Sequence, residues 1–158
     1  MRTFSLLKGL PVYELACGQK LGEVCDMSIS SDGSVVGLLV KKGALIKKTY
    51  QVKVGQVISY GHDGVMIRDR SDLKPLESEP EYTFEHQQSL AGKILLSKDG
   101  EQLGLVDDVY FLEELGTIVG YELTDGFFSD ITNGKRVVKP LGPPAIGKDA
   151  IIVNVKSR

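Results

Sequence analysis

The segment of this sequence best suited to surface chemistry carries four lysines within eight residues. Lys41-Lys42 and Lys47-Lys48 flank a short apolar stretch, Gly43 to Ile46. Paired lysines around an apolar tip could grip the phosphates of RNA or of an anionic lipid surface through counterion release. A solubilising hairpin explains the same pattern, and we take it as the simpler interpretation.

A second candidate contact segment lies in residues 124–136, where the aromatic pair Phe127-Phe128 is flanked by Asp125 and Asp130. Exposed aromatic side chains commonly mark protein-contact patches. The two rings could equally fill a hydrophobic core. If they face solvent, this acidic loop would contact a different partner from the lysine loop.

Groups able to support catalysis are few and lie apart in the sequence. His62 falls in a glycine-rich turn and His86 in a segment between the two halves of the chain. Asp107-Asp108 and Glu113-Glu114 are adjacent pairs, and neighbouring residues of a strand point to opposite faces, so neither pair can share one proton. We therefore expect no catalytic residues and a protein that is not an enzyme.

Signals for metals and cofactors are equally weak. The cysteines and histidines, at positions 17, 25, 62 and 86, lack the paired short spacings of a zinc site. A weak calcium or magnesium site from Asp99, Glu101, Asp107 and Asp108 is the alternative, although no EF-hand pattern accompanies it. The sequence has no glycine-rich phosphate loop. We expect neither a metal nor a cofactor.

Composition indicates a folded protein without a membrane span. Of its 158 residues, 42% are hydrophobic and 25% are charged, and the net charge is −2. The balance differs between the halves, because residues 1–80 carry a net charge of +2 and residues 81–158 a net charge of −4. Apolar runs stay far below the roughly 18 to 20 residues that cross a bilayer. We expect a cytoplasmic location and no integral membrane segment.

The elements that must position these residues occur twice. Leu21 to Asp26 recurs as Leu103 to Asp108, and Gly61 to Ile67 recurs as Gly147 to Val153. The spacing between the two copies drifts only from 82 to 86 residues, which indicates short loop insertions in the second copy. A repeat of this length predicts two similar folding units.

Within each copy, short alternating stretches are bounded by turn residues about every ten positions, which is typical of antiparallel strands in small β-barrels. Around Leu21, alternation places Cys25, Met27 and Ile29 on one face, although Glu23 and Val24 break the pattern. Pro75, Pro80 and several acidic residues predict a connector across residues 68–88. Its apolar residues predict that it is docked in part on a barrel wall; they are Leu73, Leu76, Tyr82 and Phe84. We predict a first domain at 1–78, a linker at 79–88 and a second domain at 89–158.

The ordered set of glycines, aspartates and strand residues resembles the PRC-barrel family. In the first copy the resemblance rests on Gly9, Leu21, Gly22, Val24, Asp26, Asp32-Gly33, Val36 to Leu38 and Gly61 to Ile67. In the second it rests on Gly92, Leu103, Gly104, Val106, Asp108, Val119-Gly120, Phe127-Phe128, Val137-Val138 and Ile146 to Val153. The Pro-Trp step that the family often has near its last strands is missing, because the chain contains no Trp.

The resemblance implies an all-β chain of two tandem, mostly antiparallel barrels of about six strands each. The same domain occurs at the C-terminal end of the ribosome-maturation factor RimM and in the cytoplasmic part of the reaction centre H subunit. These contexts imply docking to a protein or ribonucleoprotein partner. The leading hypothesis is a non-enzymatic adaptor, the alternative is an RNA- or ribosome-associated factor using Lys41 to Lys48, and a third is a small-ligand or cation sensor between the barrels. The sequence leaves the oligomeric state and the identity of the partner open.

Overall fold

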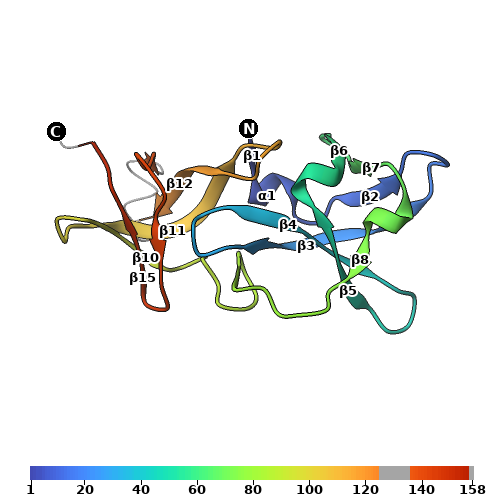
Figure 1. Cartoon of the computed structure of the whole chain (residues 1–158), viewed down its shortest axis with the longest axis horizontal. Helices are drawn as coiled ribbons and strands as arrows, with labels where there is room; N and C mark the ends of the chain where they lie inside the picture. The colour runs from blue at the N-terminus through green and yellow to red at the C-terminus, as the bar shows by residue number, and fades with distance from the viewer. Residues whose placement is uncertain (125–135, 157–158) are drawn as a thin grey trace.

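Strands make up most of the regular secondary structure of the computed structural model, which describes residues 1–124 and 136–156 (Figure 1). The first half contains β1 (Arg2–Thr3), β2 (Pro11–Glu14), β3 (Lys20–Ile29), β4 (Val35–Lys42), β5 (Lys48–Lys53), β6 (Val57–Tyr60), β7 (Val65–Ile67) and β8 (Lys74–Pro75). The second half contains β9 (Tyr82–Thr83), β10 (Ile94–Ser97), β11 (Gln102–Phe111), β12 (Ile118–Thr124), β13 (Arg136–Val138), β14 (Ala145–Ile146) and β15 (Ala150–Val153). The helical segments described are α1 (Phe4–Leu7) and the single turns η1 (Val54–Gln56) and η2 (Arg70–Asp72).

Two sheets with the same topology follow the two copies of the repeat. The first runs β6-β7-β2-β3-β4-β5-β8, and the second runs β14-β15-β10-β11-β12-β13. In each sheet one parallel pair, β2 with β7 or β10 with β15, joins strands that are otherwise antiparallel. The prediction of an all-β fold with two tandem, mostly antiparallel units of about six strands is confirmed.

A β-bulge explains the broken alternation in the sequence of β3. The pairing of β3 with β4 shifts register between Val24 and Asp26, and the pairing of β11 with β12 shifts at the equivalent place, between Val106 and Asp108. A bulge places one extra residue on one strand and redirects the side chains that follow. Asp26 consequently turns inward and is buried, while Cys25 is only half-buried.

Each half sends the segment that precedes its own sheet across to the other sheet. Strand β1 pairs with β11 of the second sheet, with Thr3 opposite Tyr110. Strand β9, which precedes the second sheet in the sequence, pairs with β3 of the first, with Thr83 opposite Ser28. The N-terminus therefore lies in the middle of the molecule, at the junction of the two sheets (Figure 1). This reciprocal exchange ties the two halves together at two related places.

The turns that end the two long hairpins also meet at the junction. The backbone N–H of Val35 donates to the carbonyl of Gly116 at 2.7 Å, and that of Ile118 donates to the carbonyl of Gly33 at 3.1 Å. Beside these bonds, the rings of Phe4 and Phe84 lie 4.8 Å apart between centroids. The buried apolar side chains of both halves form one continuous cluster. Backbone bonds and shared burial thus hold the two sheets in one arrangement.

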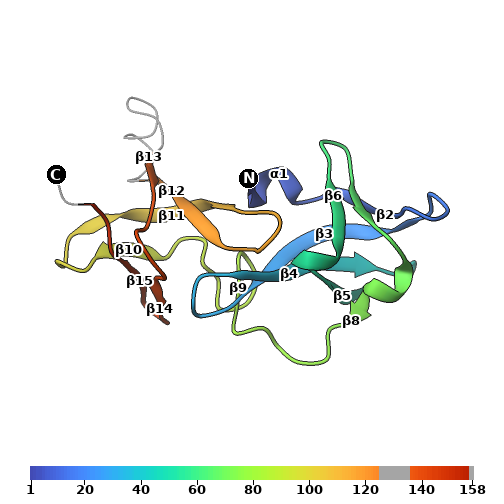
Figure 2. The same cartoon turned by 45° about the horizontal axis from the view of Figure 1, so that its top comes forward.

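The connector, residues 68–88, includes the predicted linker and is attached to the first sheet at two places, where β8 pairs with β5 and β9 pairs with β3. Leu73 and Phe84 are buried, and Tyr82 packs against the core with its hydroxyl donating to the carbonyl of Ile146. Figure 2 shows this stretch passing beneath β3 and β4 before the chain enters β10. The apolar residues in the connector therefore anchor it, as their sequence pattern predicted.

Candidate functional site

The four lysines predicted as a contact site gather at the end of one hairpin. Strands β4 and β5 pair as far as Lys42 opposite Lys48, so residues 43–47 form a loop beyond the sheet. The loop lies at the end of the first sheet that is far from the second sheet (Figures 1 and 2). Lys41, Lys47 and Lys48 are exposed, and Lys42 is half-buried. The pattern in the sequence therefore becomes a single projecting hairpin, residues 41–48, hereafter the lysine hairpin.

The tip of the lysine hairpin presents its two largest apolar side chains to solvent. Leu45 is 99% exposed and Ile46 is 79% exposed. The turn itself depends on Gly43, which has a φ of +135° and whose added Cβ would lie 2.2 Å from the carbonyl oxygen of Ile46. Only glycine avoids a steric clash in such a conformation. The exposed apolar tip is therefore part of a shaped turn.

The charged residues of the segment that carries the tip all have one sign. Residues 33–62 contain five lysines and no Asp or Glu. Among the ion pairs of the described residues, none within 4.0 Å involves a lysine of the hairpin. Lys42 instead lies over the ring of Tyr50, with its Nζ 5.5 Å from the ring centroid. The hairpin accordingly offers cationic groups that a polyanionic surface could bind.

The second predicted contact pair, Phe127 and Phe128, lies outside the described residues. The strands that lead to this loop, β12 and β13, pair as their counterparts β4 and β5 do, with Leu123 opposite Arg136. The strands that flank the two candidate segments are thus equivalent in the two sheets. Their role in binding stays a prediction.

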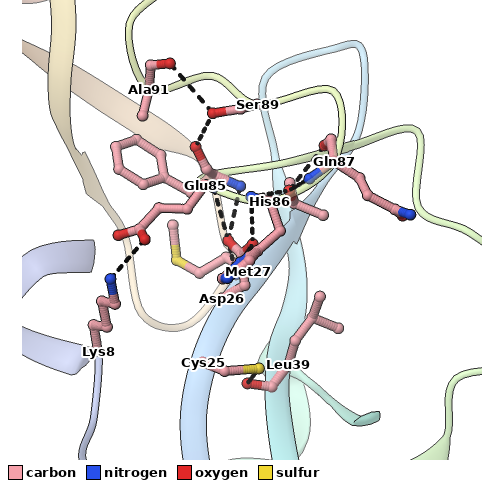
Figure 3. Close-up of polar contacts among 12 residues, drawn as sticks. Lys8, Cys25, Asp26, Met27, Leu39, Glu85, His86, Gln87, Ser89 and Ala91 are labelled. Atoms are coloured by element: carbon pink, nitrogen blue, oxygen red, sulfur yellow. Dashed lines mark hydrogen bonds and ion pairs between the residues drawn. The ribbon is translucent and has the colours of Figure 1, made fainter.

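Within residues 1–124 and 136–156, a buried carboxylate at the junction accepts hydrogen bonds from four backbone N–H groups. Asp26 is 1% exposed and accepts hydrogen bonds from the backbone N–H groups of Phe84, Glu85 and His86 at 2.9 to 3.1 Å, as Figure 3 shows. It also accepts from the N–H of Met27 at 2.8 Å and lies 2.6 Å from Nδ1 of His86. These bonds satisfy backbone donors where the connector crosses the first sheet.

Asp108 has the equivalent position and role in the second copy. It is 4% exposed, and it accepts hydrogen bonds from the N–H and the hydroxyl of Ser5 and from the N–H of Val109. Each repeat aspartate therefore holds the segment that arrives from the other half. The repeat identified both aspartates in the sequence, but not their role of binding the exchanged segments. Their place immediately before the core residues Met27 and Val109 is the signal that could have indicated burial.

The pair of His86 and Asp26 is the arrangement most similar to a catalytic dyad. The His86 side chain is 56% exposed, and a groove of about 370 Å³ beside it is also lined by Cys25. Burial raises the pKa of the Cys25 thiol, which donates a hydrogen bond to the carbonyl of Leu39 at 3.4 Å. A thiol held in its protonated form is a poor nucleophile. Sequence analysis placed His86 in the connector but did not detect its contact with Asp26.

A second polar cluster fixes the turn between β2 and β3. Glu14 is 6% exposed and accepts from the backbone N–H of Arg70 at 2.7 Å, from the Arg70 guanidinium and from the Cys17 thiol at 2.9 Å. The hydrogen bonds of Arg70 lower the pKa of Glu14 to about 2. The ion pair attaches η2 to the end of β2 in the first sheet, so its contacts belong to the scaffold.

The other polar residues singled out in the sequence lie apart. His62 is exposed in the turn between β6 and β7, where the N–H of Gly61 donates to the carbonyl of Gly64. Asp107 is exposed and Asp108 is buried, so the adjacent acids point to opposite faces. In residues 1–124 and 136–156, no three His, Cys, Asp or Glu side chains gather as a metal site.

A groove of about 480 Å³ lies on the first half, between the sheet and the connector. Its walls include Ser28, Gln51 and Lys53 from the sheet and Lys74 and Glu79 from the connector. This position differs from the junction of the two sheets, where the sensor hypothesis places a ligand. Its lining mixes both signs of charge, so it suits a polar ligand better than an apolar one.

Comparison with known proteins places both halves in one family of domains. The family model described as PRC-barrel domain matches residues 1–74 and again residues 83–158. The chain is 32% identical over 157 residues to the "Uncharacterized protein YrrD" of Bacillus subtilis (strain 168), an alignment that covers 98% of this chain and 88% of the relative. Among the described residues, no helix has the length and apolar character needed to cross a bilayer.

Proposed function

The chain belongs to the PRC-barrel family, with one domain match in each half, and from this premise we propose that it is a non-enzymatic docking protein whose contact element is the lysine hairpin. The observation that carries the proposal is the exposure of Leu45 and Ile46 at the tip of a hairpin whose four lysines have no acidic partner among the described ion pairs. Apolar side chains exposed together beside cationic groups are typical of surfaces that contact a partner.

The fate of the polar groups supports docking over catalysis. Three carboxylates are buried, and each accepts hydrogen bonds from backbone N–H groups of a neighbouring segment: Glu14, Asp26 and Asp108. A catalytic carboxylate instead needs a free oxygen within reach of a substrate proton. The family description and the name of the relative indicate no reaction either.

The exchange of β1 and β9 between the sheets supports a rigid platform beneath the hairpin. A contact element gains affinity when its scaffold does not have to become ordered on binding. Both cysteines are free, and unpaired thiols are usual in reducing compartments, so we place this docking in the cytoplasm. The segment 124–136, with Phe127 and Phe128, is proposed as a second contact directed at a different partner.

An RNA- or ribosome-associated function is the second candidate, and the four lysines favour it. In that case, replacing Lys41, Lys42, Lys47 and Lys48 with Ala weakens RNA binding and flattens its dependence on salt, because each phosphate contact adds about one counterion to the slope. Fluorescence anisotropy with single-stranded RNA at 50 to roughly 200 mM salt measures both effects. Unchanged binding by the variant removes this candidate.

Site-specific photo-crosslinking in cells of the native host tests docking itself. A photoreactive amino acid at Leu45 should form adducts, and the same group at Leu141, which is 63% exposed in the second half, serves as the matched control. We expect adducts from position 45 that disappear when the four lysines are replaced. Equal adduct patterns from both positions would refute the hairpin as the contact element.

A further inference from the structure

We infer that the lysine hairpin binds the surface of an anionic phospholipid bilayer, with Leu45 and Ile46 entering the interface and the lysines contacting the head groups. This inference rests on the proposed docking function and names its partner. Two independent features of the hairpin carry it: the apolar tip and the lysines behind the tip.

The apolar tip is the first feature. Leu45 is 99% exposed and Ile46 79% exposed, and the loop continues beyond the last paired residues of β4 and β5. Side chains at such a convex end can enter a soft apolar phase without any change in the scaffold. Amphipathic elements of peripheral proteins bury their apolar side chains to a depth of about 5 to 10 Å at the boundary of head groups and acyl chains.

The order of groups along the hairpin is the second feature. Moving back from the tip, the apolar residues come first and the lysine pairs follow on both strands, with Lys42 opposite Lys48 and Lys41 opposite Thr49. An anionic bilayer has the complementary order, with an apolar interior beneath a layer of negative charge. Residues 33–62 contain no acidic residue, and Glu23 of β3 lies opposite Lys41, behind the Lys42–Lys48 pair as seen from the tip.

The same features fit the other classes of partner less well. RNA would pair with the lysines, but it offers Leu45 and Ile46 no apolar phase, and single-stranded RNA is bound mainly by aromatic stacking and Arg. The aromatic residue of the hairpin strands, Tyr50, is half-buried and lies beneath Lys42. A protein partner would need a concave pocket that combines an apolar floor with an acidic rim.

Gly43 gives the tip the shape that insertion requires. Its φ of +135° and the 2.2 Å approach of a Cβ to the carbonyl of Ile46 mean that Gly43→Ala must reshape the turn. This variant keeps all four lysines and both apolar residues. It therefore separates the shape of the tip from its composition.

The test uses the full chain, which contains no tryptophan, so that Leu45→Trp introduces a single reporter at the tip. The variant is titrated with vesicles of phosphatidylglycerol and phosphatidylcholine and, separately, with vesicles of phosphatidylcholine alone. Leu141→Trp, at a residue 63% exposed in the second half, is the matched reporter. We expect a blue shift of the emission and quenching by brominated lipid only for the tip reporter and only with the anionic vesicles.

Variants without the reporter then separate charge from insertion in a vesicle co-sedimentation assay. Lys47→Gln with Lys48→Gln should weaken binding about 25-fold, at about fivefold for each lysine. Leu45→Ser with Ile46→Ser should weaken vesicle binding by about tenfold or more, because the tip then has no large apolar side chains to bury in the bilayer. Lys98→Gln with Lys156→Gln removes two exposed lysines of the second half and should change binding less than twofold.

Four outcomes decide the matter. Loss of binding in both hairpin variants, with a shift at position 45, supports the inference. Binding that resists Leu45→Ser with Ile46→Ser, or a tip reporter that keeps its emission, overturns insertion. No binding to anionic vesicles, together with salt-sensitive RNA binding that needs the lysines, overturns the bilayer as partner but leaves docking through the hairpin intact. Absence of adducts at position 45 in cells overturns the docking function itself.

Discussion

Replacing the buried aspartate of each repeat should destabilise the fold unequally, and the inequality can be worked out from the hydrogen bonds. Asp26→Ala removes the carboxylate acceptor of the backbone N–H groups of Met27 and Glu85, and it leaves those of Phe84 and His86 with their second acceptors, the Met27 carbonyl and the Thr83 hydroxyl. An orphaned buried donor costs about 1 to 3 kcal/mol, and the loss of the shared bonds adds less, so we expect a loss of about 3 kcal/mol.

Asp108→Ala removes fewer hydrogen bonds. Its carboxylate accepts from the N–H and hydroxyl of Ser5 and from the N–H of Val109, and the bond from the Ser5 N–H is long, at 3.3 Å. We therefore expect a loss of about 2 kcal/mol, which is about 1 kcal/mol less than for Asp26→Ala.

Urea unfolding measures both losses, with Asp63→Ala as the control. Asp63 is exposed in the turn between β6 and β7, and its replacement should stay within about 0.5 kcal/mol of the wild type. Amide hydrogen exchange adds a local signature, because residues 84–86 should lose protection in Asp26→Ala while β4 keeps its protection. A cost for Asp108→Ala equal to or above that for Asp26→Ala would refute the account of the repeat aspartates as anchors of the exchanged segments.

Three further changes test the scaffold. The pKa of Glu14 is lowered to about 2 by Arg70, so the stability advantage of the wild type over Glu14→Gln should be complete above about pH 4.5 and decline as pH falls toward 2, which urea midpoints across that range would show. Tyr121→Phe should raise stability by about 0.5 to 1 kcal/mol in urea unfolding, since among the described residues the buried Tyr121 hydroxyl has no hydrogen-bond partner. Gly116→Ala should cost about 3 kcal/mol or more in a urea series, because the added Cβ would lie 2.1 Å from the carbonyl oxygen of Val35 in the first half. Gly9→Ala is the control: it has open space around it and should cost about 1 to 2 kcal/mol for its positive φ alone.

Much of the architecture could be predicted from local sequence signals. The repeat that relates Leu21 to Asp26 with Leu103 to Asp108 predicted two equivalent sheets, because the same alternation and turns recur in each copy. The exposure of the lysine hairpin could also be predicted, because four charged residues around Gly43 cannot all be buried. Local patterns were sufficient wherever a strand and its partner are neighbours in the sequence.

The junction could not be predicted in the same way. Strands β1 and β9 are two residues long, and each pairs with a strand of the other half, so neither carries enough alternation to reveal its partner. The contact of His86 with Asp26 joins residues 60 positions apart and depends on that exchange. The predicted division at 1–78, 79–88 and 89–158 stays a proposal, because connector and core are continuous across it.

The central claim is that partners contact the protein at the lysine hairpin. Solution NMR of the full chain, with backbone amides followed during titration with anionic vesicles, single-stranded RNA or polyglutamate, tests this without assuming the partner. Whichever polyanion binds, amide shifts and line broadening should concentrate in residues 41–50, with β10 to β15 unchanged. Perturbations centred on the second sheet, or spread evenly over both halves, would contradict it.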